Sequence, residues 1–119
     1  MASSKDFVGP PAWCILHSYA AAYTPDQRKK FISFVKTLGT LFPCSTCRKN
    51  FNKKLKILPL EPYLGNNNDL FFWTYCIHAM VNEAITETDP SNLKSSPPYD
   101  RVKFAYFQKM GELCKDCNV

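Results

Sequence analysis

Two pairs of cysteines with the spacing Cys-x-x-Cys are the residues in this sequence most able to do chemistry. The first pair, Cys44 and Cys47, lies in FPCSTCRKNF, and the second, Cys114 and Cys117, lies in CKDC near the end of the chain. Neighbouring thiols can exchange disulfides, bind zinc as thiolates or form a local bridge. The two pairs therefore predict an electron path with two dithiols, a four-thiolate zinc site, or inert staples.

The surroundings of the first pair favour redox chemistry. Pro43 ends one predicted helix and places Cys44 in the first turn of the next. Backbone N–H groups at a helix start stabilise a thiolate, and Arg48 and Lys49 add positive charge. Zinc ribbons usually hold their cysteine pairs about fifteen to twenty residues apart, with strands around them. A non-catalytic interaction module, stapled by zinc on four cysteines, remains the alternative.

The two tryptophans and two histidines of the chain fall in matching Trp-then-His arrangements on two predicted helices. Trp13 precedes His17 by four residues on the first, and the second carries Trp73, His78, Val81 and Asn82. Residues four apart project from one side of a helix. Core packing explains either arrangement alone, but together, beside a dithiol, they could clamp a large planar ring. The sequence lacks G-x-G-x-x-G and P-loop motifs, so a flavin held between helices fits.

The elements that position these residues are all predicted to be helical. Apolar residues recur at three- and four-residue spacing, and no segment alternates as a strand does. Thr24, Pro25 and Gln27 form a capping-box signature at the start of the second helix. The predicted helices cover residues 10–23, 24–42, 44–58, 69–88 and 99–113. We expect four antiparallel helices with a fifth lying across them, and a short polar tail after residue 113.

Length and composition limit the remaining classes. The 119 residues form one domain, with 45% hydrophobic residues. Basic residues cluster on predicted helices, and we interpret them as a solvated face rather than a nucleic-acid site. No apolar run approaches the roughly 20 residues of a membrane span, and MASSKDFVGPP lacks a signal core. We therefore expect no membrane and no nucleic-acid partner.

Three motifs, in order, resemble the Erv/ALR family of FAD-linked sulfhydryl oxidases, the group of augmenter of liver regeneration. They are GPPAWCILH at 9–17, TPDQRKKFISFVKTLGTLFPCSTC at 24–47, and WTYCIHAMVNEA at 73–84. The likeness covers residues 9–86 and implies an all-α fold. That fold is a four-helix bundle plus a short fifth helix, with FAD bound between helices, usually in a homodimer packed through its first two helices.

The resemblance also implies roles for individual residues. The catalytic set is Cys44, Cys47, Cys114 and Cys117. The FAD-binding set is Gly9, Trp13, His17, Cys47, Trp73, His78, Val81 and Asn82. Cys44 would receive electrons and Cys47 would lie against the isoalloxazine ring. The pair at 114 and 117 would act as a shuttle dithiol in a tail over 114–119, outside an FAD-binding domain over 1–113. No metal is implied.

The implied activity is thiol oxidation to disulfides in substrate proteins, with electrons passing through Cys44–Cys47 and FAD to O2 to give H2O2. A protein dithiol, such as one on a thioredoxin-like carrier, would be the substrate. The sequence departs from the family pattern at Val8 and Ala79, and the candidates for binding the FAD phosphates are Lys94, Arg101 and Lys103.

A structural disulfide common in cellular members is missing from the pattern. Cys14 and Cys76 are therefore expected to be buried free thiols, with a bridge between them as the alternative. The missing disulfide and the short length resemble virus-encoded members, which work in the infected host cell's cytoplasm. The mitochondrial intermembrane space is the alternative compartment.

Overall fold

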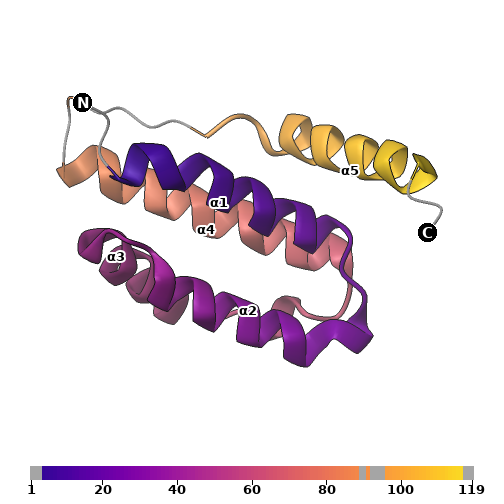
Figure 1. The fold of residues 1–119 in the computed structure, drawn as a ribbon, viewed down its shortest axis with the longest axis horizontal. Helices are drawn as coiled ribbons and strands as arrows, with labels where there is room; N and C mark the ends of the chain where they lie inside the picture. The colour runs from indigo at the N-terminus through magenta and orange to yellow at the C-terminus, as the bar shows by residue number, and fades with distance from the viewer. Residues whose placement is uncertain (1–3, 89–90, 92–95, 117–119) are drawn as a thin grey trace.

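Five α-helices form a bundle in the part of the protein that the structure describes (Figure 1). The structure is a computed structural model that describes residues 4–88, 91 and 96–116, with side chains described for 11–87, 91 and 96–108. None of the described residues forms a strand, so the all-α prediction is confirmed. The elements are α1 Ser4–Ala21, η1 Pro25–Gln27, α2 Arg28–Leu41, α3 Ser45–Ile57, η2 Glu61–Tyr63, α4 Asn67–Thr88 and α5 Tyr99–Asp116.

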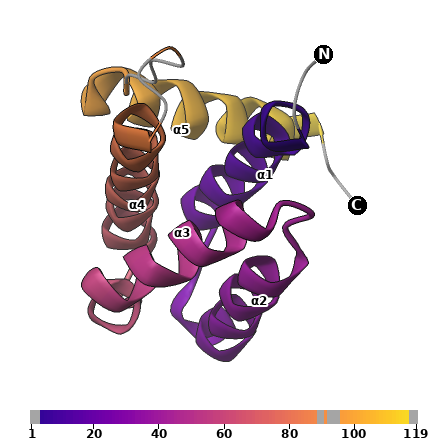
Figure 2. The same ribbon diagram turned by 90° about the vertical axis from the view of Figure 1, so that its left-hand side faces the viewer.

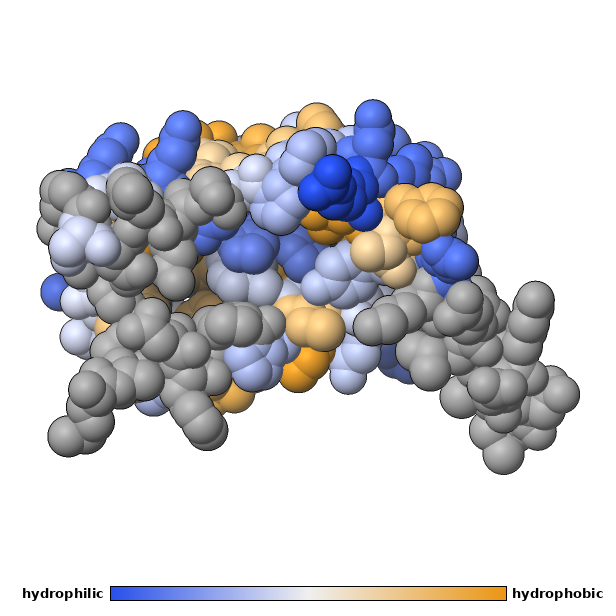
Figure 3. Space-filling model, turned by 90° about the horizontal axis from the view of Figure 1, so that it is seen from above, coloured by the Kyte–Doolittle hydropathy of each residue, from blue (hydrophilic) through white to orange (hydrophobic). Residues whose placement is uncertain are grey.

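The helices lie in layers around α1 and α4, which pack against each other (Figures 1 and 2). Helix α3 contacts α4, and α2 contacts α3 on the same side of the bundle. Helix α5 lies on the opposite side, over α1 and α4, which agrees with the predicted fifth helix lying across the others. Figure 3 looks down on that side and shows hydrophobic residues among hydrophilic ones.

The core lies where α1, α3 and α4 meet. Each of these helices turns large apolar side chains inward at three- and four-residue spacing. Burying one such side chain contributes about 1.5–3 kcal/mol to folding. The largest fully buried side chains are Trp73, Phe51, Phe71, Leu16, Leu64, Leu70, Ile77 and Thr74.

Polar contacts fix the end of α1 against the start of α4. The hydroxyl of Tyr23 donates to the carbonyl of Leu64 at 2.8 Å, and Nδ2 of Asn67 donates to the carbonyl of Ala21 at 3.0 Å. Both carbonyls lie in segments where helical backbone partners run out, so side chains satisfy them instead. These bonds set the register in which α1 and α4 face each other.

Two helix boundaries differ from the prediction. Helix α1 begins at Ser4, so Pro10 and Pro11 lie in its interior rather than in its opening turn. Helix α5 has 18 residues and continues to Asp116, so it is neither short nor followed by a tail that begins at 114. Gly111 alone costs a helix only about 1 kcal/mol, and no proline separates it from Cys114. The helix therefore continues through the predicted boundary.

The start of the second helix carries the predicted capping box between Thr24 and Gln27. Oε1 of Gln27 accepts the backbone N–H of Thr24 at 3.2 Å. The Thr24 hydroxyl also donates to the carboxylate of Asp26. The first turn is a 3-10 helix, Pro25–Gln27, and the α-helix begins one turn later than predicted, at Arg28.

Candidate functional site

The predicted redox dithiol lies at the start of α3. Cys44 is the N-cap of this helix, one position before the predicted first turn, and its extended backbone (φ −92°, ψ 121°) ends the preceding segment. Its Sγ accepts the backbone N–H of Cys47 at 3.3 Å. The N-terminal end of a helix carries partial positive charge, which favours the thiolate form of a sulfur placed there. Both cysteines are half-buried, so the pair is reachable from solvent.

The junction before this dithiol is held by a side chain that follows it. Nη1 of Arg48 donates to the carbonyl of Phe42, the residue that caps the end of α2. That carbonyl has no helical partner of its own, and a cation at a helix C-terminus is favourable. Arg48 therefore fixes the turn between α2 and α3, with Pro43 and Cys44 inside it.

A buried phenylalanine connects the dithiol to the centre of the bundle. Phe51 follows Cys47 by one helical turn on the same face of α3 and is 2% exposed. Its ring makes edge contacts with Phe42, at 5.5 Å between centroids, and with Trp13 of α1, at 6.1 Å. Phe51 therefore connects the helix face that carries Cys47 to Trp13 of α1.

The aromatic cluster consists of Trp13, His17 and His78, which the structure brings together from α1 and α4. Trp13 and His78 stack with 4.1 Å between ring centroids and 10° between planes. His17 lies 5.3 Å from His78 and 6.1 Å from Trp13 by the same measure. Trp13 and His78 are half-buried, whereas His17 is 3% exposed. The aromatic face formed by Trp13 and His78 is therefore partly accessible to solvent, whereas His17 lies buried behind it.

A chain of hydrogen bonds orients both imidazoles. The hydroxyl of Thr74 donates to the carbonyl of Phe71 at 2.6 Å, so its oxygen accepts from Nδ1 of His17 at 2.9 Å. Nε2 of His17 is then the acceptor, and Nδ1 of His78 donates to it at 3.1 Å. We assign both rings as neutral Nδ1–H tautomers from this network. The outer end of the chain is the lone pair on Nε2 of His78.

Burial keeps both histidines neutral. Desolvation lowers the pKa of His17 to about 3, and the neighbouring His78 contributes to that lowering. Desolvation also lowers the pKa of His78 to about 4. At neutral pH the cluster therefore presents an uncharged acceptor beside an aromatic face, rather than an imidazolium.

Helix α5 closes the cluster on one side. The ring of Tyr106 lies 5.1 Å from the ring of His17, centroid to centroid. Desolvation and a hydrogen bond with Cys14 raise the pKa of Tyr106 to about 12. Cys14 is a free thiol, but it is exposed, which corrects the expectation that it is buried. Cys76 on α4 is also a free thiol, and it is half-buried.

Trp73 does not join this cluster. Its side chain is fully buried, and its Nε1–H donates to the carbonyl of Leu58 at 3.0 Å, at the end of α3. Trp73 and His78 are five residues apart, which rotates their side chains about 140° from each other. In this structure the two Trp-then-His arrangements therefore do not face each other as a matching pair. A role for Trp73 in shaping the site stays a prediction.

Of the other predicted site residues, the structure describes the side chains of Val81 and Asn82 but not those of Gly9, Cys114 and Cys117. Val81 and Asn82 are half-buried on α4, where Nδ2 of Asn82 donates to Oγ of Ser96 at 3.2 Å. The backbones of Gly9 and Cys114 lie within α1 and α5, but their surroundings lie outside the described side chains. Cys117 lies outside the described residues altogether.

Thr74, which anchors the histidine chain, was not predicted from the sequence. The signal was available, since Thr74, His78 and Asn82 recur every fourth residue along one face of α4. The contact between His17 and His78, which are 61 residues apart in sequence, was not predicted either. Only the packing of α1 against α4 creates that contact.

The described residues place limits on two other kinds of site. Among the side chains that the structure describes, no group of three His, Cys, Asp or Glu residues could hold a metal ion. The alternative of zinc on four cysteines needs Cys114 and Cys117, whose side chains lie outside that set, and it stays untested. Within the described helices, no stretch is both long and apolar enough to cross a membrane.

Comparison with known proteins identifies the class to which this fold and site belong. A sequence model of the Erv1 / Alr family matches residues 10–99. That range includes the Cys44–Cys47 dithiol and the whole aromatic cluster. The chain therefore belongs to the Erv1/Alr family, as its three motifs predicted.

Individual relatives carry related names. The chain is 28% identical over 86 residues to the FAD-linked sulfhydryl oxidase ERV1 of Oryza sativa subsp. japonica, covering 69% of this chain and 43% of that protein. It is 28% identical over 82 residues to the mitochondrial FAD-linked sulfhydryl oxidase ERV1 of Saccharomyces cerevisiae, covering 66% and 42%. It is 30% identical over 83 residues to the FAD-linked sulfhydryl oxidase of African swine fever virus, covering 66% and 68%.

The matches cover less than half the length of the plant and yeast relatives and about two thirds of the viral one. No solved structure matches the chain significantly.

Proposed function

We propose that this protein is an FAD-dependent thiol oxidase. The observation that carries the proposal is the dithiol at the start of α3, which Phe51 connects to the Trp13–His78 stack. The names of the plant, yeast and viral relatives support the same activity and the same cofactor. The substrate would be a protein dithiol, which is oxidised to a disulfide, and O2 would accept the electrons.

The aromatic cluster and two cations on α5 fit FAD in three respects. The half-buried faces of Trp13 and His78 offer a surface on which an aromatic ring can stack. Nε2 of His78 offers a neutral acceptor for an exocyclic amine, of which adenine carries one. On α5, the exposed Arg101 and half-buried Lys103 are cations available to the phosphates. When bound, FAD supplies a two-electron acceptor that takes electrons from a dithiol and transfers them to O2, giving H2O2.

The protein's own residues would divide the thiol chemistry between the two sulfurs. An incoming substrate thiolate attacks Cys44 of a Cys44–Cys47 disulfide, and Cys47 leaves as a thiolate. The second substrate thiol then attacks the mixed disulfide and restores the Cys44 thiol. The substrate has lost two electrons and two protons, and the protein dithiol has gained them. Cys47 suits the inner role because it shares a helix face with the buried Phe51.

We propose that Cys114 and Cys117 carry electrons from large substrates to Cys44, in the manner implied by the family resemblance. A protein dithiol, including one on a thioredoxin-like carrier, is the proposed donor. A second pair suits this role because it can meet a bulky substrate without exposing the inner dithiol.

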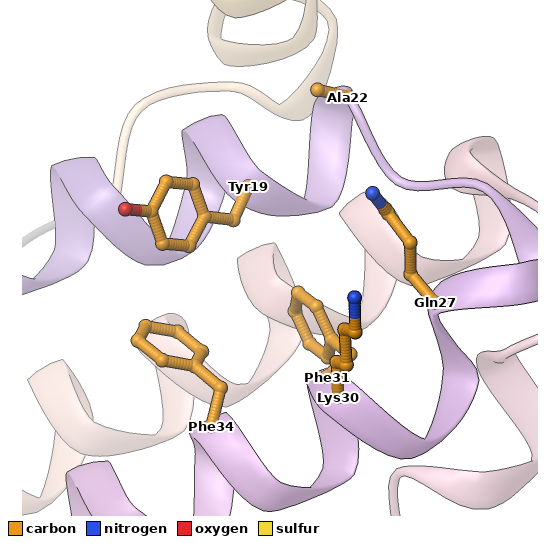
Figure 4. A pocket seen from close by; sticks show the side chains of 6 residues that line it. All are labelled: Tyr19, Ala22, Gln27, Lys30, Phe31 and Phe34. Atoms are coloured by element: carbon orange, nitrogen blue, oxygen red, sulfur yellow. The ribbon is translucent and has the colours of Figure 1, made fainter.

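We also propose a homodimer formed through α1 and α2. Figure 4 shows the hollow between these helices, with Tyr19 of α1 facing Phe34 of α2. Their ring centroids are 5.3 Å apart, and Tyr19 is 55% exposed. Ile15, one turn before Tyr19 on α1, is 46% exposed. Phe34 itself is half-buried. Exposed aromatic and aliphatic side chains that lie together, as Tyr19 and Ile15 do on α1, are typical of a subunit interface.

The cytoplasm of an infected host cell is the compartment we propose, with the mitochondrial intermembrane space as the alternative. Cys14 and Cys76 are free thiols, and Cys14 is exposed. An exposed free thiol persists more readily where thiols are kept reduced. One relative is named as mitochondrial and another is viral, so relatives occur in both settings.

The absorbance spectrum of the purified protein tests the proposed function. Oxidised flavin gives a band at about 450 nm, a general property of the ring system, and dithiothreitol should then be oxidised with release of peroxide. Cys47→Ser should keep the yellow colour and lose the oxidation. A colourless protein that contains zinc, or a Cys47→Ser variant with full activity, would contradict the proposal.

A further inference from the structure

A groove between the end of α2 and the length of α3 has a strongly cationic lining. Its volume is about 570 Å³. Four of its side chains are basic, and the remaining ones are small or uncharged. The lining consists of Gly39, Thr40, Ser45, Arg48, Lys49, Asn52, Lys53 and Lys56. We call it the cationic groove.

The close approach of two helices forms the floor of this groove. Nδ2 of Asn52 on α3 donates to the carbonyl of Gly39 on α2 at 3.1 Å. A Cβ atom at position 39 would lie 2.5 Å from Oδ1 of Asn52, so glycine is needed for this approach. The two helices are therefore joined by this contact at the floor of the groove, and the basic side chains lie around it.

The sequence around the groove contains no acidic residue that would balance its positive charge. Residues 28–60 contain nine basic residues and no acidic residue. Lys49, Lys53 and Lys56 are exposed and lie on one face of α3, at i, i+4 and i+7. Like charges at this spacing destabilise a helix slightly. A merely solvated face usually mixes both signs, so this stripe favours an anionic partner.

The cationic groove is next to the dithiol. Ser45 lines the groove and directly follows Cys44, and Arg48 lines it and directly follows Cys47. Leu41, at the end of α2 and beside the groove residue Thr40, is 70% exposed. A polypeptide bound in the groove would thus have neighbouring residues within reach of the two sulfurs.

We propose that the cationic groove docks an acidic segment of the polypeptide whose thiols react at Cys44–Cys47. This inference rests on the proposed oxidase function and adds the chemical character of a polypeptide substrate that reacts at Cys44–Cys47 directly, without passing its electrons through Cys114 and Cys117. A polypeptide is favoured over nucleic acid because the reactive group at the rim is a dithiol, whose partner must carry sulfur. Complementary charge would act mainly by steering association, so its effect falls as salt rises.

The test compares two dithiol peptides that differ only in charge. One carries four glutamates beside a Cys-x-x-Cys pair, and the other carries glutamines at the same positions. We expect wild-type protein to oxidise the acidic peptide with about tenfold higher kcat/KM at low salt. The difference should lie in KM and should disappear at high salt. Equal kcat/KM for the two peptides at low salt would overturn the proposal.

Charge reversal locates the effect. Lys53→Glu combined with Lys56→Glu should remove the preference for the acidic peptide and leave dithiothreitol oxidation unchanged, which also shows that the variant is folded. If it does not fold, the Lys→Gln pair at the same positions serves. The matched control is Arg28→Glu with Lys29→Glu, at the other end of α2, which should keep the preference. An equal loss in the control would mean that net charge alone acts, and the groove assignment would be wrong.

A binding assay separates this proposal from the oxidase function. Fluorescence anisotropy with an acidic peptide whose cysteines are replaced by serine reports docking without turnover. Docking that is lost in the Lys53/Lys56 variant supports the groove even if wild-type protein fails to oxidise dithiothreitol. A labelled single-stranded oligonucleotide that binds through these lysines, with no binding of the acidic peptide, would assign the groove to nucleic acid instead.

Discussion

His17 and His78 share a hydrogen bond of 3.1 Å between Nε2 of one ring and Nδ1 of the other. Because Thr74 fixes the tautomer of His17, the bond also fixes which nitrogen of His78 is the outward acceptor. Thr74 on α4 thus determines, through His17 on α1, which nitrogen of the half-buried His78 ring can accept a further hydrogen bond.

Thr74→Val should destabilise the fold. Valine has nearly the shape of threonine but leaves Nδ1–H of the buried His17 without its acceptor, which costs about 1–3 kcal/mol. Urea denaturation monitored by circular dichroism measures the free energy of unfolding. Thr74→Ser keeps the hydroxyl and should retain the 15N chemical shifts of both imidazoles. Unchanged tautomers and unchanged stability in Thr74→Val would show that the chain of hydrogen bonds does not matter.

Stability should fall with acid in a window set by the histidines. Both folded-state pKa values, about 3 for His17 and about 4 for His78, lie below the unfolded value of 6.5. Unfolded protein therefore binds more protons than folded protein between these limits. The stabilisation is fully present above pH 6.5 and is lost progressively as pH falls toward 4 and then 3.

Each histidine contributes a slope of up to about 1.4 kcal/mol per pH unit in that window. Denaturant titrations at pH 7, 6 and 5 measure how the free energy of unfolding changes with pH. His78→Asn should reduce this slope by up to the contribution of one histidine, about 1.4 kcal/mol per pH unit. NMR titration provides the direct check, because histidine signals that move with a pKa near 6.5 in the folded protein would refute the burial argument.

His78→Ala should weaken the retention of FAD. The substitution removes the ring stacked on Trp13 at 4.1 Å and the acceptor at Nε2. Losing one such stacking contact alone costs about 0.5–1.5 kcal/mol, or a roughly two- to tenfold weaker affinity. Flavin fluorescence on titration with FAD measures the affinity. Met80→Ala, half-buried on another face of α4, is the control, and equal affinities in the two variants would argue against a role for the cluster.

Gly39→Ala should destabilise the contact between α2 and α3. An alanine usually stabilises a helix relative to glycine, but here its Cβ would lie 2.5 Å from Oδ1 of Asn52. Overpacking of this kind costs about 1–3 kcal/mol. Thermal unfolding measures the loss. Gly65→Ala, which meets no atom within 4 Å, should be nearly neutral, and Asn52→Ala should largely suppress the Gly39→Ala defect. An equal defect with Asn52→Ala present would place the cause elsewhere.

Cys114→Ser should separate small from large substrates. If Cys114 and Cys117 relay electrons from proteins, the variant should oxidise dithiothreitol at the wild-type rate and oxidise a reduced protein much more slowly. Peroxide release with each reductant measures the two activities in parallel. Equal rates with the reduced protein in variant and wild type would remove the relay role. Equal losses with both reductants would point to a structural defect in α5.

The helices and the dithiol position were accessible from the sequence because they depend on local rules. Apolar spacing predicted five helices, and Pro43 predicted the break that places Cys44 at the start of α3. Boundaries were less accessible. The interior of α1 accommodates Pro10 and Pro11, and α5 continues past Gly111 to Asp116, although local propensity favours ending a helix at such residues.

The candidate site was accessible only in part. The sequence determined its components: a Cys-x-x-Cys pair, stackable aromatic rings, two histidines, and a stretch of α2 and α3 without acidic residues. The tertiary structure decided which of them meet. It stacked Trp13 on His78, buried Trp73 against the end of α3, recruited Thr74, and placed the lysines around a groove beside the dithiol. The reason is physical, because residue type and helical period act locally, whereas contacts such as that between His17 and His78 depend on how whole helices pack.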